Sequence, residues 1–247
     1  MKKICLNIFS LSILMGCMNA CNKSGTVQTD QLSDYMQLQV GKYMTYRLDS
    51  LVFINFGTQD TIISYLARDV IDDSITDNLG RPSWRVIRYI TDTNGIAPWT
   101  PIETYMITPT RQATEVVENN LRFIKLVLPV VNGYNWTGNS YIDTRSAFSD
   151  LTWMDGWNYI YDSVGMPYSL PNQIVPSSII VRQDNDSSGA VADSVFSTKT
   201  FSEEVYGKGI GLIYKNLLHW EYQPPNINVP VGSTSGFGIK LTMVDHN

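Results

Sequence analysis

The sequence predicts an all-β, mostly antiparallel fold, and two observations carry that prediction. From Lys42 onward the chain consists of short segments rich in Val, Ile, Thr, Tyr and Trp, separated by Gly, Asn, Asp and Pro. Several segments alternate apolar and polar residues, which is typical of strands that have one buried face. The chain shows no internal repeat of fixed period, so solenoids and propellers are disfavoured.

The alternation is clearest from Ser83 to Ile90, where Trp84, Val86 and Ile90 share one face and Arg88 is the exception. Applied to the whole chain, the same criteria predict strands at 42–55, 60–71, 83–92, 102–108, 113–118, 121–128, 157–163, 174–183, 195–206, 209–218 and 236–244.

Two turns and one helix are expected between these strands. Asn119 and Asn120 predict a tight hairpin, because Asn tolerates the positive φ that such turns need. Residues 92–95, Asp-Thr-Asn-Gly, predict a second turn. The stretch 145–154 is the one plausible helix, in which Phe148, Leu151 and Trp153 are expected to cover an open end of the sheet.

The composition fits one globular domain over residues 35–247. The chain has 247 residues, of which 43% are hydrophobic, and its aromatic residues include 14 Tyr and 6 Trp. All-β domains often use this length as a single unit. The sequence therefore predicts a sizeable core.

Residues 1–16 predict a signal peptide. Lys2 and Lys3 form a positive start, and a mostly apolar stretch follows from Ile4 to Met15. The apolar stretch is too short for a transmembrane helix. We therefore expect export from the cytoplasm.

The residues that follow the leader resemble the lipobox of bacterial lipoproteins. Leu14-Met15-Gly16-Cys17 has the small residue before the cysteine that is acylated in that family, and Met18-Asn19-Ala20-Cys21 is a poorer copy. We expect the lipid on Cys17, with Cys21 as the alternative; an ordinary secretory leader with incidental cysteines is the other interpretation. Residues 17–34 are polar after the anchor and are expected to form a flexible tether to the domain.

Charge and cysteine content exclude several function classes. The formal charge is −5, and loss of the leader with Lys2 and Lys3 makes it −7, so nucleic acid should be repelled. No cysteine follows Cys21, which excludes disulfides and thiolate metal sites in the domain. No catalytic or cofactor motif is recognisable, and only His219 and His246 are available for zinc or a triad. We therefore predict no catalytic residue and no cofactor.

One short motif suggests a metal and is rejected. Asp184, Asp186 and Ser188 are spaced like the first ligands of a calcium loop. Val195 stands where that loop needs its bidentate acid. A polar hairpin accounts for the same residues, so no metal site is predicted.

The surplus of aromatic residues supplies the only candidate ligand contacts. Flat rings on a concave sheet suit an apolar molecule or a sugar, although core packing and cross-strand pairing account for such residues as well. The candidate residues are Trp136, Trp153, Trp157, Tyr159, Tyr161 and Trp220.

Three stretches resemble envelope lipoproteins of unknown function from the Bacteroidota: Val40–Arg47, Leu128–Trp136 and Val205–Ile213. Proteins of this kind are similar in fold to the lipoprotein-localisation carriers. The resemblance implies a strongly curved sheet, a half-barrel or open barrel with at most one or two short helices, whose concave face holds acyl chains. The segment 145–175 is an insertion relative to a minimal half-barrel.

The function expected from these observations is that of a non-enzymatic binding or scaffolding module. It would be an outer-membrane lipoprotein, held to the membrane by its lipid, with a hydrophobic ligand or an envelope protein as partner. No acidic residue precedes Asp30 after the anchor, which favours the periplasmic face, since surface-exposed relatives often carry acids there.

Two other functions stay open. A hydrolase of envelope polysaccharide would need two acids in one groove. The adjacent pairs Asp72-Asp73 and Glu203-Glu204 are expected to point to opposite faces of their strands and so not to share a substrate. A structural partner of an outer-membrane assembly would instead show an exposed apolar patch.

Overall fold

The computed structural model describes residues 30–189, 195–227 and 230–247, and it has the all-β antiparallel fold that the sequence predicts. Twelve strands form a single sheet. Their bounds are β1 Tyr43–Ile54, β2 Gln59–Thr76, β3 Pro82–Thr91, β4 Thr100–Pro109, β5 Ala113–Glu118, β6 Leu121–Val127, β7 Asn135–Trp136, β8 Tyr159–Leu170, β9 Gln173–Ser188, β10 Ser197–Gly207, β11 Gly211–Gln223 and β12 Ser233–His246.

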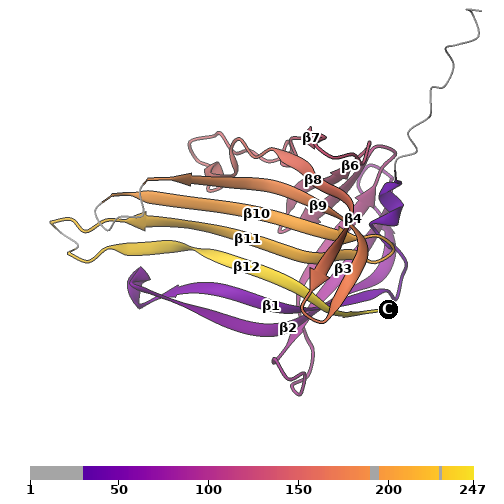
Figure 1. Ribbon diagram of the computed structural model, residues 1–247, viewed down its shortest axis with the longest axis horizontal. Helices are drawn as coiled ribbons and strands as arrows, with labels where there is room; N and C mark the ends of the chain where they lie inside the picture. The colour runs from indigo at the N-terminus through magenta and orange to yellow at the C-terminus, as the bar shows by residue number, and fades with distance from the viewer. Residues whose placement is uncertain (1–29, 190–194, 228–229) are drawn as a thin grey trace, which may run out of the picture.

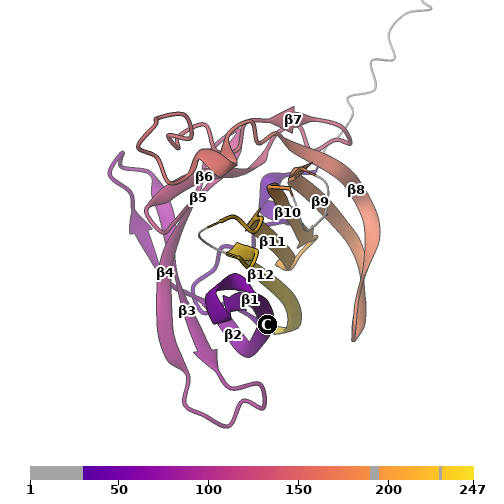
Figure 2. The same ribbon diagram turned by 90° about the vertical axis from the view of Figure 1, so that its left-hand side faces the viewer.

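The sheet curls into a nearly closed barrel (Figures 1 and 2). Its strand order is β6-β5-β4-β3-β2-β1-β12-β11-β10-β9-β8-β7, with every neighbouring pair antiparallel and β1 paired to β12. Five neighbouring pairs join strands consecutive in the chain on each side of that central junction. The curved sheet expected from the resemblance is therefore confirmed, and it goes further round than a half-barrel.

Hydrogen bonds from both main-chain and side-chain groups join the two edges of the sheet. Ile124 N donates to Gly138 O at 2.7 Å, and Trp136 Nε1 donates to Ile124 O at 2.8 Å. The Tyr161 hydroxyl accepts from Val127 N at 2.8 Å and donates to Val127 O at 2.6 Å. These contacts satisfy main-chain groups on the outer edge of β6, which has no full partner strand on that side.

Both turns predicted from the sequence, at residues 119–120 and 92–95, are present. Asn119 and Asn120 have φ of 53° and 62°, and they join β5 to β6. The carboxylate of Asp92 accepts from the main-chain nitrogens of Asn94, Ile96 and Ala97, which fixes the second turn.

The helix expected at 145–154 is wrong. Only the three residues of η4, Thr152–Met154, form a 3₁₀ turn, and Phe148 is 97% exposed. Asp143 Oδ1 accepts from the main-chain nitrogens of Arg145 and Ser146, and such local side-chain bonds compete with helix formation. The irregular chain between β7 and β8 nevertheless lies at one end of the barrel.

Residues 30–34, the described part of the range expected to form the tether, pack against the domain. Leu32, in η2 (Leu32–Asp34), is 8% exposed, and Tyr35 is fully buried in the same core cluster. Lys208 Nζ donates to Asp30 at 2.5 Å, which holds this segment against the β10–β11 turn. Cys17 and Cys21 lie outside the described residues.

Candidate ligand site

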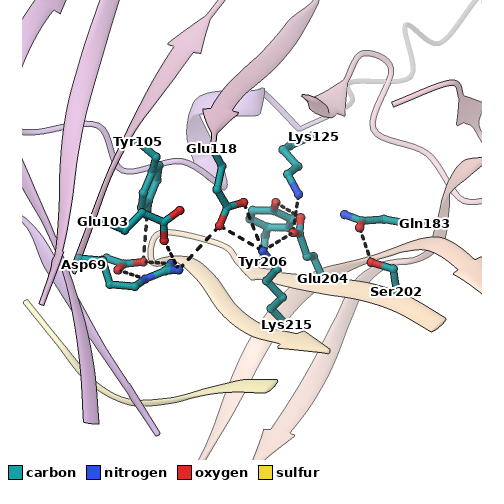
Figure 3. Close-up of polar contacts among 11 residues, drawn as sticks. Asp69, Glu103, Tyr105, Glu118, Lys125, Gln183, Ser202, Glu204, Tyr206 and Lys215 are labelled. Atoms are coloured by element: carbon teal, nitrogen blue, oxygen red, sulfur yellow. Dashed lines mark hydrogen bonds and ion pairs between the residues drawn. The ribbon is translucent and has the colours of Figure 1, made fainter. Parts of the chain in front are cut away.

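The inner wall of the barrel carries a charged cluster, which Figure 3 shows with its polar neighbours. Its members are mostly buried, they come from seven different strands, and no two are adjacent in sequence. They are Asp69, Arg88, Glu103, Glu118, Lys125, Glu204 and Lys215.

Arg88 and Asp69 form the tightest pair of the charged cluster. Arg88 Nε and Nη2 donate to the two carboxylate oxygens of Asp69 at 2.6 and 2.7 Å, and Tyr105 adds a hydroxyl donor at 2.9 Å. Glu103 accepts from Arg88 at 3.0 Å. The exception in the alternation of β3 is thus explained: Arg88 faces inward like Val86 because its charge is paired there.

Two lysines and two glutamates form the other half of the charged cluster. Lys125 Nζ donates to Glu204 Oε1 at 2.6 Å, and Lys215 Nζ lies 3.3 Å from Glu118 and 3.9 Å from Glu204. Tyr206 donates a further hydrogen bond to Glu204 at 2.6 Å. Positive and negative charges are equal in number within this half.

The pKa shifts follow from these contacts. Burial alone would raise the pKa of Glu118, but Lys215, Lys125 and Arg88 outweigh it and lower the pKa to about 2. The same balance lowers the pKa of Glu204. Burial would lower the pKa of Lys215, yet the two glutamates raise it. Glu118, Glu204 and Lys215 are therefore charged at neutral pH.

A cavity of about 290 Å³ opens beside this half of the charged cluster. Apolar side chains make most of its wall: Phe123, Trp153, Trp157, Leu217, Phe237 and Ile239. Leu121, Leu151 and Met154 also belong to this apolar part, and the polar side chains of the wall are Glu118, Asn119, Lys125, Tyr159, Gln183, Ser202 and Lys215. Such a mixture of an apolar wall and a few polar groups is typical of small-molecule sites.

Two buried polar groups of the wall have no hydrogen-bond partner. They are Gln183 Nε2, on a residue 2% exposed, and the hydroxyl of Tyr159, on a residue that is fully buried. Figure 3 shows the amide nitrogen of Gln183 pointing toward the side on which Lys125 lies. Each buried group without a partner costs about 1–3 kcal/mol, so these groups require an explanation.

β-bulges aim two of the polar side chains into the barrel. The register of β9 against β10 passes from Asp184 to Arg182, which leaves Gln183 without an opposing residue. The register of β6 against β5 passes from Leu126 to Ile124 in the same way and leaves Lys125 unopposed. Bulges often redirect a side chain beside a functional site.

The chain between β7 and β8 covers the cavity with aromatic residues. Trp153 stacks on His219 with ring centroids 4.6 Å apart, and it meets Phe237 and Trp157 edge-on at 5.7 and 5.4 Å. His219 also contacts Thr200 through Nδ1 at 3.0 Å, and burial lowers its pKa. His219 is thus a neutral, buried ring under the covering segment; His246 ends β12.

The six aromatic residues singled out from the sequence divide into three groups. Trp153, Trp157 and Tyr159 line the cavity. Trp136 and Tyr161 bind the edge of β6 and so close the barrel. Trp220 follows His219 directly in β11 and therefore points to the opposite face of the sheet.

The residues resembling a calcium loop lie in an extended strand. Asp184, Asp186 and Ser188 belong to β9, and Ser188 shares a hydrogen bond with Thr198. Among the residues that the structure describes, no group of three or more His, Cys, Asp or Glu side chains is placed to hold a metal ion.

The acid pairs do not assemble a hydrolytic site. A bulge in β2 lets Asp72 and Asp73 both reach Arg85, so the expectation that they point to opposite faces is wrong there. Glu204 is buried inward while Glu203 is only half-buried, as expected. Glu118 and Glu204 both contact Lys215. Both have lowered pKa values, whereas a general acid needs a raised pKa.

A larger hollow of about 620 Å³ lies between the N-terminal segment and the ends of β4 and β5. It contains one unpartnered buried hydroxyl, that of Thr114. Its wall is more polar than that of the smaller cavity and includes Gln31, Ser33, Gln37, Gln39, Thr110 and Arg111. The cavity beside Gln183 is the better-defined site.

Sequence reasoning missed Gln183, Ser202 and the charged cluster. One signal was present, since Arg88 interrupts the apolar face of its strand. The bulges at Lys125 and Gln183 have no counterpart in the sequence pattern.

Comparisons with known proteins supply no further assignment: no family model, no curated protein and no solved structure matches the chain. Within 30–189, 195–227 and 230–247, no helix is both long and apolar enough to cross a membrane.

Proposed function

We propose that this protein is a lipid-anchored binding module of the bacterial envelope that holds a small, largely apolar molecule in its barrel. One observation carries the proposal: an aromatic-lined cavity of about 290 Å³ contains two buried polar groups without partners, on Tyr159 and Gln183. A ligand that fills the cavity removes apolar surface from water and supplies the missing partners.

The arrangement favours binding over catalysis. The charges that line the cavity, on Glu118, Lys125 and Lys215, are each held by an ion pair. The lowered pKa of Glu118 and the raised pKa of Lys215 keep both groups charged at neutral pH, so neither is suited to take up and release a proton there. Binding a molecule without transforming it is therefore the function that this wall supports best.

An uncharged fluorophore, N-phenyl-1-naphthylamine, tests the proposal on the full chain. We expect its fluorescence to rise on mixing with the protein and the rise to saturate at one molecule per chain. Leu217→Trp, which fills the cavity, should abolish the rise. The matched control is Leu218→Trp on the opposite face of β11, which should bind like the unaltered protein.

Two results would overturn the binding function. One is absence of any saturable rise with the unaltered protein. The other is an equal rise in Leu217→Trp and Leu218→Trp, provided that circular dichroism shows both variants to be folded.

The proposed localisation in the envelope depends on the leader and its cysteines, and a separate experiment tests it. Cells fed labelled palmitate should incorporate the label into the protein. Cys17→Ser should remove the label, whereas Cys21→Ser should not. If neither substitution changes the label, or no label enters, the anchor is wrong while the binding site is unaffected.

Docking of a partner protein is a second candidate, favoured by exposed apolar tips. Three hairpins project at the same end of the molecule, the left in Figure 1. Their described ends carry Ile54, Phe56, Ile62, Val195, Phe196, Ile227 and Val231, of which Phe56 is fully exposed and has φ of 58°. Chemical cross-linking in the envelope should capture a partner with the unaltered protein and lose it in Phe56→Ser.

A further inference from the structure

We infer that the molecule held in the cavity is an uncharged amphiphile that presents a carbonyl oxygen, from an ester, amide or ketone, to Gln183 and Tyr159. This inference rests on the proposed binding function and adds the chemical class of the ligand. It depends on three features of the cavity: its unpartnered groups can act as hydrogen-bond donors, the charges of its wall balance, and its volume is small.

The free group of Gln183 is a donor. Its Oε1 accepts from the Ser202 hydroxyl at 2.6 Å, a distance typical of O–H···O bonds and short for N–H···O bonds. The other end of the amide is therefore the nitrogen, which donates and does not accept. The ligand atom that meets it must be an acceptor.

A carbonyl oxygen is an acceptor that suits each of the two unpartnered groups. The Tyr159 hydroxyl can donate or accept, and burial beside Glu204 and Glu118 raises its pKa, so it keeps its proton. A carbonyl oxygen has two lone pairs and accepts from two donors. A hydroxyl ligand would fit less well, because it also brings a proton that needs an acceptor.

The charges of the wall leave no counter-charge for a ligand. Lys125 is held by Glu204, and Lys215 lies between Glu118 and Glu204, so two positive and two negative groups balance. A charged head group would enter a buried site without an opposite charge of its own, which is costly. The remaining members of the charged cluster, Asp69, Glu103 and Arg88, do not line the cavity.

The size of the cavity limits the apolar part. A volume of about 290 Å³ equals roughly ten water molecules at about 30 Å³ each. It lies at the lower end of the range for small-molecule pockets. A chain of about ten carbons, or a flat ring system of similar volume against Trp153 and Trp157, fills it.

Displacement of N-phenyl-1-naphthylamine measures the preference directly. Three competitors of equal chain length are added to the full-length protein at neutral pH: methyl decanoate, decanoate and decylamine. We expect the uncharged ester to displace the fluorophore at a concentration about tenfold lower than either ion does.

Variants of the two donors test the contact itself. Gln183→Leu and Tyr159→Phe should each weaken displacement by methyl decanoate about tenfold. They should leave the affinity for the fluorophore, which has no carbonyl group, nearly unchanged. Gln173→Leu, an exposed glutamine on the same strand, is the matched control and should change neither value.

The failure of this inference is distinguishable from failure of the binding function. If the fluorophore binds and is lost in Leu217→Trp, but decanoate or decylamine competes as well as the ester, the ligand class is wrong and the site stands. The same holds if Gln183→Leu and Tyr159→Phe both bind the ester like the control. If the fluorophore does not bind at all, the binding function itself falls.

Discussion

The two sides of the barrel interior treat their buried polar groups differently. On the side of β2 and β3, Arg88 and Asp69 are joined by two hydrogen bonds, and Tyr105 adds a third; Glu103 is bound to Arg88 through Oε2, and its Oε1 has no hydrogen-bond partner. On the side of β8 and β9, the uncharged groups of Tyr159 and Gln183 have free hydrogen-bonding capacity beside a cavity. The first side contributes to holding the fold, whereas the second carries the free groups on which the proposed binding function rests.

The difference has a physical basis. A buried charge without a partner costs several kcal/mol, so a folded chain must pair it internally. A neutral donor costs about 1–3 kcal/mol when unpaired, which a domain can tolerate at a few positions. An unpaired neutral group therefore offers a polar contact to a ligand at a smaller cost in folding free energy than an unpaired charge does.

The largest effect is expected from removing a charge on the paired side. Arg88→Met leaves Asp69, which is 1% exposed, without its main partner and should lower the free energy of unfolding by about 3–5 kcal/mol. Urea unfolding measures the loss. Arg47→Met, which removes the exposed pair with Asp49, is the control and should cost at most about 1 kcal/mol. Equal losses would contradict the importance of burial.

The second-largest effect is expected from acid, which should lower the free energy of unfolding by protonating Glu118. The pKa of Glu118 is about 2 in the folded protein and 4.5 without its neighbours, so its contribution is complete above pH 4.5. That contribution is lost as the pH falls from 4.5 toward 2, and we expect a decrease of about 3 kcal/mol in the free energy of unfolding.

Unfolding curves recorded across this window measure the decrease. In Glu118→Gln the pH dependence should be shallower, because the titrating group is gone. A variant with the same slope as the unaltered protein would show that Glu118 is not the group responsible.

No loss of stability is expected on the unpaired side. Tyr159→Phe removes a buried hydroxyl that has no partner and should therefore raise the free energy of unfolding by about 1–3 kcal/mol. Tyr161→Phe removes a hydroxyl that serves both main-chain groups of Val127 and should cost about 2 kcal/mol. Thermal unfolding of the two variants compares them; a larger loss in Tyr159→Phe would mean that its hydroxyl is already bonded.

Sequence patterns predicted the strands because period and turn chemistry are local. The alternation around Val86 and the positive φ at Asn119 and Asn120 need no distant contact. The two-residue strand β7 was missed, since Asn135 and Trp136 are too few to show a period. Leu32 was assigned to the tether because a single apolar residue among polar ones gives no sign of burial.

The candidate site was only partly predictable for a different reason. Aromatic residues are visible in the sequence, and three of those singled out there, Trp153, Trp157 and Tyr159, line the cavity. Gln183 owes its inward direction to a one-residue mismatch with β10, and that mismatch exists only once the two strands are paired. Unpaired hydrogen-bonding capacity is likewise a property of the assembled barrel and not of any segment.

The pairing of β1 with β12 affects how the barrel assembles. Residues 43–54 meet residues 233–246 in the middle of the sheet, with Leu48 opposite Leu241. Contacts so distant in sequence slow folding. Here they join strands β1–β6 to strands β7–β12, and within each group every strand pairs with its neighbour in sequence. During synthesis, β1 would have an unpaired edge until β12 is made, and a chaperone that shields sheet edges would matter most in that period.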